Sequence, residues 1–103
     1  MTVEDIRKMV TGVAPLAKHY HASKKGDSFT VWGEYERAGQ GAEDRHDFGW
    51  FFEIDHYTKN EDDPIPPLIE QALIDHPGVS YTYTVGYDTA HGYIRHIFDC
   101  EGY

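Results

Sequence analysis

The sequence has few of the features that would cross-link the chain or anchor it in a membrane. Its single cysteine, Cys100, cannot form a disulfide within the chain, which excludes a disulfide framework. No apolar run approaches the ~20 residues of a membrane-spanning helix. Residues 1–10 carry acidic side chains among the apolar ones, unlike a secretory signal. We therefore expect a soluble, intracellular protein, and its 103 residues suit a single domain, residues 1–103.

Basic residues are also scarce. The chain has 9 Lys and Arg against 18 Asp and Glu, which gives a formal net charge of −9. Nucleic-acid binding depends on basic side chains that release counterions from the phosphates, so this charge disfavours a nucleic-acid partner. No glycine-rich loop leads from a strand into a helix, so a phosphate-binding loop is not expected either.

The first half of the sequence predicts one helix and two strands. Thr2 and Asp5 form a variant of the capping box, and apolar residues recur at helical spacing over residues 3–11. Gly12 and Pro15 end this pattern, after which residues 16–21 alternate in a way that suits a short strand; continuation of the helix is the alternative. Residues 29–36 alternate and are rich in β-branched and aromatic side chains, which predicts a longer strand. Residues 38–47 are glycine-rich and charged, which predicts a hairpin loop that is mobile in the isolated protein.

The second half predicts a strand, a helix and a hairpin. A strand begins at Phe48 and has one wholly apolar and one mixed face. Asp62 or Asp63 can cap a helix whose apolar stripe runs over residues 65–73 and which stops at Pro77 and Gly78. Alternation over residues 79–87 and 93–98 predicts a hairpin. The order α-β-β-β-α-β-β predicts an α+β, two-layer domain, with a mainly antiparallel sheet and helices packed on one face.

Side chains with catalytic or metal-binding chemistry do not form a recognisable motif. His19 and His21 would share one face of a short strand, but further metal ligands would have to come from distant residues. Cys100 and His96 could act as a thiol and a base, yet no oxyanion partner accompanies them. The adjacent acids before the second helix are explained by capping. We therefore expect no catalytic residue, no cofactor and no metal ligand.

Aromatic side chains, in contrast, are abundant: 8 Tyr, 5 Phe and 2 Trp. They exceed what one helix-covered sheet face can hide, which predicts an uncovered face that serves as a protein–protein interface with aromatic anchors and a polar rim. The residues that we assign to this interface are Trp32, Glu34, Phe51, Glu53, Asp55, Tyr57, Tyr83, Tyr87 and Tyr93. The alternative is that the sheet curls and buries both of its faces.

Several segments together resemble a known family. They are MTVEDI at the start, VWGEYE before a glycine-rich acidic loop, FFEIDHYTK before the second helix, and PGVSYTYTVGYD in the hairpin. The most specific are residues 53–59 and the turn between Tyr87 and Tyr93. In this pattern, which covers nearly the whole chain, the sequence resembles small tail-terminator or neck proteins, which join head and tail in long-tailed bacteriophages and prophages.

The resemblance implies a non-enzymatic structural protein of the virion. Members of the family assemble as a ring, often a hexamer, that stops growth of the tail tube and meets the head connector. The implied partners are copies of the chain and other tail or neck proteins, and the implied locations are the virion and, during assembly, the host bacterial cytoplasm. No cofactor, small-molecule substrate, sequence-specific nucleic acid or membrane is implied, and an acidic ring suits a channel through which DNA passes without sticking.

Two other functions remain open from the sequence. An acidic inhibitor, such as a toxin-immunity or anti-nuclease protein, would present carboxylates that imitate nucleic-acid phosphates to a basic partner. It would place Asp44, Asp47, Asp62 and Asp63 on one surface. A small enzyme would need a deep pocket that holds two histidines and a carboxylate.

Overall fold

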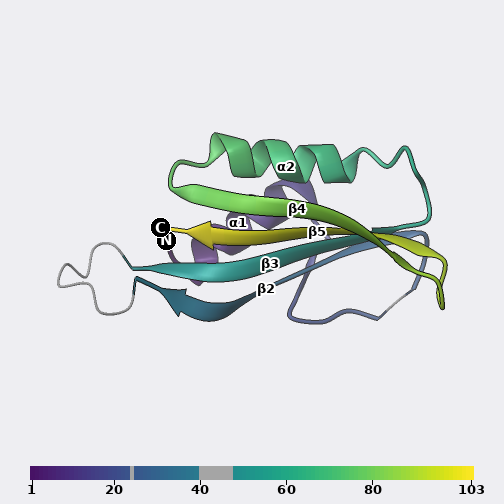
Figure 1. The fold of residues 1–103 in the computed structure, drawn as a ribbon, viewed down its shortest axis with the longest axis horizontal. Coiled ribbons are helices and arrows are strands. Elements are labelled where there is room, and N and C mark those ends of the chain that lie inside the picture. Colours follow the sequence, from purple (N-terminus) through teal and green to yellow (C-terminus); the bar gives the residue numbers. More distant parts are fainter. Residues whose placement is uncertain (24, 40–47) are drawn as a thin grey trace.

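The described residues form one sheet and two helices. The structure is a computed structural model, which describes residues 1–23, 25–39 and 48–103. The elements follow the predicted order (Figure 1). They are α1 (Val3–Val13), β1 (Lys18–His19), β2 (Ser28–Ala38), β3 (Gly49–Thr58), α2 (Ile65–Asp75), β4 (Val79–Asp88) and β5 (Tyr93–Gly102). The predicted α+β class is confirmed.

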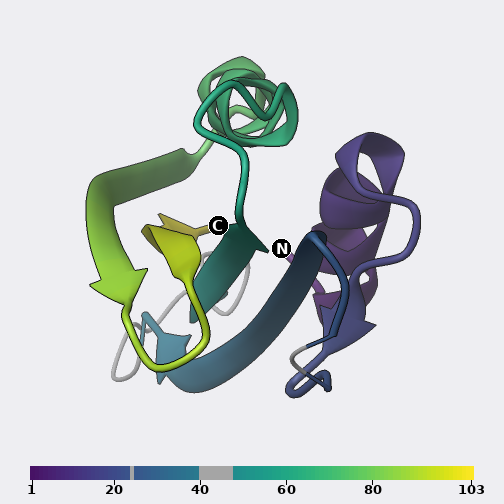
Figure 2. The same cartoon turned by 90° about the vertical axis from the view of Figure 1, so that its right-hand side faces the viewer.

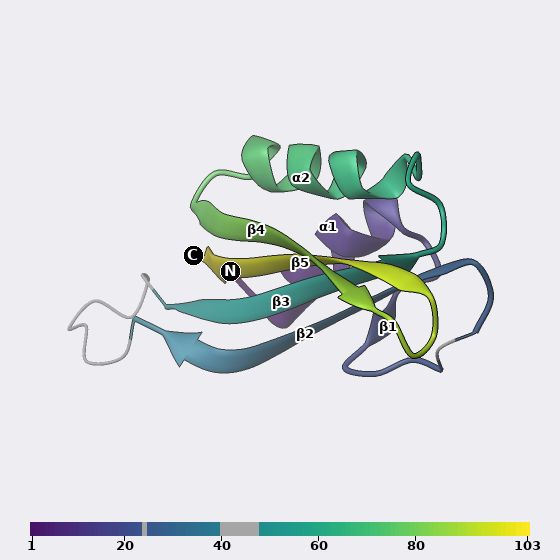
Figure 3. The ribbon, with the colours of Figure 1, turned by 45° about the vertical axis from the view of Figure 1, so that its right-hand side comes forward.

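The five-stranded sheet has the strand order β1-β2-β3-β5-β4. All neighbours are antiparallel except β1, which is parallel to β2, so the sheet is mixed at one edge. Figure 2 shows both helices on the same side of the sheet. By the strand order, β4 and β2 lie toward opposite edges of the sheet. In the part of the chain that the structure describes, no helix lies over the other sheet face (Figure 3).

The predicted capping box starts α1. The Thr2 hydroxyl oxygen accepts a hydrogen bond from the Asp5 N–H at 3.1 Å, and the Asp5 carboxylate accepts one from the Thr2 N–H at 2.8 Å. The helix continues two residues past the predicted end, to Val13. Ile6 and Val10 are buried one turn apart, so α1 packs one apolar stripe of side chains against the sheet.

The start of α2 depends on Asp63. Pro64 is the N-cap residue, and the carboxylate of Asp63 just before it accepts a hydrogen bond from the Ile65 N–H at 2.8 Å. Asp62, the other predicted cap, is exposed. Prolines in the first turn are tolerated because their missing N–H groups would have no helical partner there.

The core lies between the helices and one face of the sheet. The register places Trp32 beside Ile54, and Ile54 beside Phe98, in one row across β2, β3 and β5. All three are buried against side chains of both helices. The prediction that Trp32 lies on the uncovered face is wrong: its side chain is 2% exposed and belongs to the helix side. Alternation shows which residues of β2 share a face, but only the β2–β3 register decides which face meets the helices.

The predicted mobile loop over residues 38–47 lies mostly outside the described residues. Its first residue, Ala38, ends β2 and is buried. Asp44 and Asp47, two of the four acids assigned to an inhibitor surface, also lie outside the described part. Neither described helix is long and apolar enough to cross a lipid bilayer.

Candidate functional site

The candidate site is the sheet face that points away from both helices, which we call the open face. Its side chains come from alternate positions of four strands, aligned by the sheet register. They are Phe29, Val31, Gly33 and Tyr35 of β2; Phe51, Glu53, Asp55 and Tyr57 of β3; Tyr93, Arg95, Ile97, Asp99 and Glu101 of β5; and Ser80, Thr82, Thr84, Gly86 and Asp88 of β4. Among the residues that the structure describes, no helix covers them.

At one end of the open face, three aromatic rings cover one another. Phe29 stacks on Tyr57 with ring centroids 4.7 Å apart, and Tyr93 meets both rings edge-on at 5.4 and 6.0 Å. The Tyr93 hydroxyl donates a hydrogen bond to the Gly26 carbonyl at 2.7 Å. Tyr57 and Tyr93 are therefore only 8% and 4% exposed. At this end the alternative expectation holds, because the sheet buries its second face without a partner.

The middle of the open face carries two acids that share one cation. A guanidinium nitrogen of Arg95 lies 2.9 Å from an oxygen of Asp55 and 3.3 Å from an oxygen of Glu53. Burial, together with hydrogen bonding to Asp55 and its charge, raises the pKa of Glu53 to about 7. Asp55 Oδ1 and Arg95 Nε are buried and have no hydrogen-bond partner in the described part of the chain. Glu53 therefore binds a proton more readily than an exposed glutamate does.

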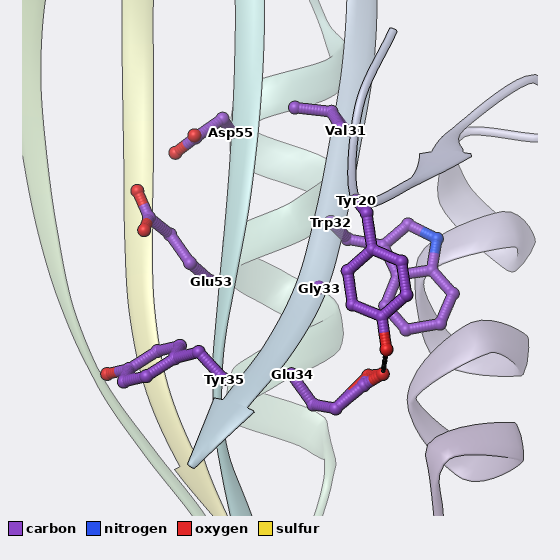
Figure 4. Close-up of a pocket in the computed structure, with 8 residues that line it drawn as sticks. All are labelled: Tyr20, Val31, Trp32, Gly33, Glu34, Tyr35, Glu53 and Asp55. Carbon is purple, nitrogen blue, oxygen red and sulfur yellow. Dashed lines mark hydrogen bonds between the residues drawn. The ribbon is translucent and has the colours of Figure 1, made fainter.

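A shallow depression of about 300 Å³ lies over Gly33, where β2 lacks a side chain between Val31 and Tyr35 (Figure 4). The ring of Tyr20 folds over this glycine, and a Cβ at Gly33 would lie 2.8 Å from the ring. The Tyr20 hydroxyl donates a hydrogen bond to Glu34. A side chain at this position would displace the tyrosine ring.

Glu34 lies at the outer edge of β2 and is held by residues of the β1 region. His19 Nε2 lies 3.0 Å from one of its carboxylate oxygens, and Tyr20 hydrogen-bonds to the same group. Burial opposes ionisation of Glu34, but these hydrogen bonds outweigh it and lower the pKa of the carboxyl. His19 thus pairs with Glu34, whereas His21 is exposed. Among the described residues, no group of three or more His, Cys, Asp or Glu could hold a metal ion.

The other end of the open face exposes aromatic rings. Tyr35 is 57% exposed, and its ring lies 6.3 Å from that of Phe51, which is half-buried. The Tyr35 hydroxyl donates a hydrogen bond to Asp99 at 2.7 Å, and this bond, with burial, raises the pKa of Tyr35 to about 12. A second depression, of about 410 Å³, runs from these two rings toward β4. We call Tyr35, Phe51, Asp99 and Glu101 the exposed end of the open face.

The nine predicted interface residues do not form one surface. Those on the open face are Phe51, Glu53, Asp55, Tyr57 and Tyr93. Tyr83 lies on the helix side, where its ring stacks on Phe98 at 4.4 Å and its hydroxyl hydrogen-bonds to His96 Nδ1 at 2.6 Å. Tyr87 lies near the end of β4 and is the most exposed aromatic residue of that strand. Tyr35 and Tyr20, which the sequence-based assignment missed, complete the open face in place of Trp32.

No protein-family model matches this sequence, and no curated protein matches it either.

A buried polar relay lies on the helix side, close to the start of α2. The Thr30 hydroxyl and His56 Nδ1 lie 2.7 Å apart, and His56 Nε2 lies 2.8 Å from Asp63. Hydroxyl, imidazole and carboxylate are also the groups of a hydrolase triad. Here the Thr30 and His56 side chains are almost fully buried, and the other oxygen of Asp63 holds the Ile65 N–H. The relay therefore fastens the start of α2 to the sheet.

Proposed function

We propose that this protein is a non-enzymatic structural component of a bacteriophage or prophage virion, of the tail-terminator or neck type. In this role it caps the tail tube and joins it to the head connector, acting with copies of itself and with neighbouring tail or neck proteins. It works in the host bacterial cytoplasm during assembly and stays in the virion. The proposal starts from the sequence resemblance, and the surface chemistry of the open face supports it.

The observation that carries the proposal is the exposed end of the open face. Tyr35 and Phe51 present aromatic area next to the carboxylates of Asp99 and Glu101. Aromatic side chains are enriched at protein interfaces and supply much of their binding energy, whereas charged residues form the rim. The core on the other side of the sheet is complete without them. These rings therefore remain free to pack against another protein.

The charge of the open face also suits this role. Acids outnumber bases on this face: the carboxylates of Glu53, Asp55, Asp88, Asp99 and Glu101 accompany the guanidinium of Arg95. A protein that lines or borders a DNA channel gains from such a surface, because it does not retain the phosphate backbone. A protein partner that docks here would meet the acids with basic or hydrogen-bond-donating groups.

Polymerisation of tail tubes tests the proposal. The tube protein of the phage or prophage that encodes the chain is assembled with and without this protein, and tube lengths are measured by electron microscopy. We expect the wild type to stop growth and to remain at tube ends. Tyr35→Ala combined with Phe51→Ala should abolish capping while the circular dichroism spectrum stays unchanged. Leu16→Ala, which removes an exposed apolar side chain outside the exposed end of the open face, is the control and should cap normally. Unchanged tube lengths with the wild type would contradict the proposal.

The same preparations separate capping from inhibition by charge mimicry. Charge mimicry requires carboxylates that face a partner. The carboxylate of Asp63 is instead hydrogen-bonded to His56 and to the Ile65 N–H, which argues against mimicry through this residue. A charge mimic loses its basic partner steeply as salt rises. Docking through aromatic rings should change little between low and physiological salt, and a steep loss of tube-end binding would favour the mimic.

A further inference from the structure

The two edges of the sheet are protected very differently. At the β2 edge, β1 pairs with part of the strand, a register shift lies between Glu34 and Glu36, and Arg37 follows. Short covering strands, bulges and charged residues are the devices by which proteins prevent an edge strand from pairing with another chain. β4 has none of them. It runs ten residues in unbroken register with β5, and no charged residue or proline occurs before Asp88.

The outer edge of β4 is also open to solvent. Among the described residues, only β5 pairs with it. The side chains of Thr82, Tyr83, Thr84 and Val85 are all exposed, although they point alternately to the two sides of the sheet. On the helix side, Tyr81 donates a hydrogen bond to Glu70 of α2. Ile74, four residues after Glu70 and on the same side of α2, is exposed as well.

We propose that β4 is a self-pairing edge: it binds the β4 strand of a second copy of this chain, antiparallel and about a two-fold axis. In one register the whole uncharged run, residues 79–87, is paired. Tyr83 then lies on the axis, opposite Tyr83 of the partner subunit. On the helix side, Tyr81 lies opposite the partner's Val85. On the open-face side, Thr82 lies opposite the partner's Thr84.

These pairs are the kinds that stabilise antiparallel strands. Aromatic side chains pair favourably with aromatic or β-branched ones, and Thr pairs with Thr. A second copy fits this edge because residues 81–85 (YTYTV) read nearly alike in both directions about Tyr83, so each strand meets matching side chains. Two copies that each carry a net charge of −9 repel one another over most of their surface, so an uncharged stretch favours their approach. β4 provides that stretch, since in this register Asp88 lies opposite the partner's uncharged Gly78.

The pairing goes beyond the proposed function and does not depend on it. A two-fold axis perpendicular to the sheet joins the two five-stranded sheets into one continuous sheet. Both open faces then point to the same side, and both α2 helices lie on the other side, with Ile74 toward the seam. The exposed ends of both open faces remain uncovered, so tube capping and β4 pairing can succeed or fail separately.

Sedimentation equilibrium from micromolar to millimolar concentration tests the inference, combined with hydrogen exchange. We expect a monomer–dimer equilibrium and backbone protection over residues 80–87 that rises with concentration. A protein that stays monomeric at millimolar concentration would overturn the inference. So would a dimer whose concentration-dependent protection lies on other strands.

Charge substitutions then test the register. Thr82→Lys combined with Thr84→Lys places lysines opposite lysines across the axis and should raise the dimer Kd by about tenfold or more. Thr82→Glu combined with Thr84→Glu should do the same. An equimolar mixture of the two double variants places Lys opposite Glu and should form a heterodimer more tightly than either double variant pairs with itself.

The control is Thr89→Lys, in the exposed turn after β4, which should leave the dimer Kd within about twofold of the wild type. Thermal unfolding of each variant verifies that it folds. If the double variants dimerise as well as the wild type, or if the mixture pairs no better than its components, β4 is not the contact.

Discussion

Replacing Trp32 by alanine tests the assignment of the two sheet faces. The indole is buried between the sheet and α1: the His19 ring stacks on it at 4.0 Å, and the Arg7 guanidinium lies 5.2 Å from its centroid. Removal of a fully buried Trp leaves a cavity and typically lowers the free energy of unfolding by about 3–5 kcal/mol. For a domain of this size we expect the midpoint of thermal unfolding of the variant to lie at least about 12 °C below that of the wild type.

Tyr35→Ala is the matched comparison on the opposite face of the same strand. This ring is 57% exposed and keeps one hydrogen bond, to Asp99. Its loss should lower the free energy of unfolding by about 1 kcal/mol or less. Urea unfolding followed by circular dichroism measures both variants against the wild type. If Trp32→Ala costs less than Tyr35→Ala, the assignment of faces, and with it the open face, is refuted.

Three further predictions concern single groups. Because the folded-state pKa of Glu53 is raised from 4.5 to about 7, wild-type stability should fall as pH rises between these values. Glu53→Gln should lack this fall in stability. A difference in the free energy of unfolding between variant and wild type that stays constant over that pH interval would contradict the prediction. Asp63→Asn should lower the free energy of unfolding at neutral pH by about 1–3 kcal/mol and speed hydrogen exchange in α2. Asp62 is exposed, so the control Asp62→Asn should change the free energy of unfolding by no more than about 0.5 kcal/mol. Equal effects of Asp63→Asn and Asp62→Asn would refute the relay. Gly33→Ala should destabilise the protein by about 1 kcal/mol or more by displacing the tyrosine ring over it, whereas Gly86→Ala, with open space around its Cβ, should not. Urea unfolding that gives equal values for the two alanine variants would show that the ring is not held there.

The pH dependence of Asp63 has the opposite sign to that of Glu53. Hydrogen bonds outweigh the burial of Asp63 and lower the pKa of this carboxyl in the folded state. Its contribution to stability is therefore present above the ordinary pKa of 3.8 and is lost as pH falls through the lower folded-state value.

Local signals in the sequence were enough to predict the elements. The capping box of Thr2 and Asp5 forms as expected, because both of its hydrogen bonds lie within one helical turn. The apolar stripe of α2 and the alternation of β4 and β5 likewise depend on neighbours a few residues apart. The predicted element order and the α+β class follow from such short-range patterns.

Contacts between distant segments could not be predicted in the same way. Phe29 and Trp32 lie on opposite faces of β2, and either face carries enough apolar area to meet a helix. Tyr20 contacts Gly33 from a left-handed backbone conformation, with φ of 72°. No residue next to Tyr20 in the sequence predicts this conformation. The one available signal was Gly33 itself, a residue without a side chain in an otherwise bulky strand.

The relay between His56 and Asp63 was missed for a related reason. The two residues lie seven positions apart, and a histidine within an apolar strand face gives no indication of its partner. The sequence suggests a helix cap or an acidic surface for Asp63, whereas in the structure one of its oxygens accepts the Ile65 N–H and the other lies against His56. Buried polar groups require partners, so a histidine on the core face of β3 does predict that some partner exists.

Hydrogen exchange of the protein bound to tail tubes tests most directly whether the open face is the docking surface. Amides of β2 around Tyr35 and of β3 around Phe51 should exchange more slowly in the bound protein than in the free protein. Amides of α1 and α2 should exchange at the same rate in both states. Protection confined to the helices, or no binding to tubes at all, would contradict docking through the open face.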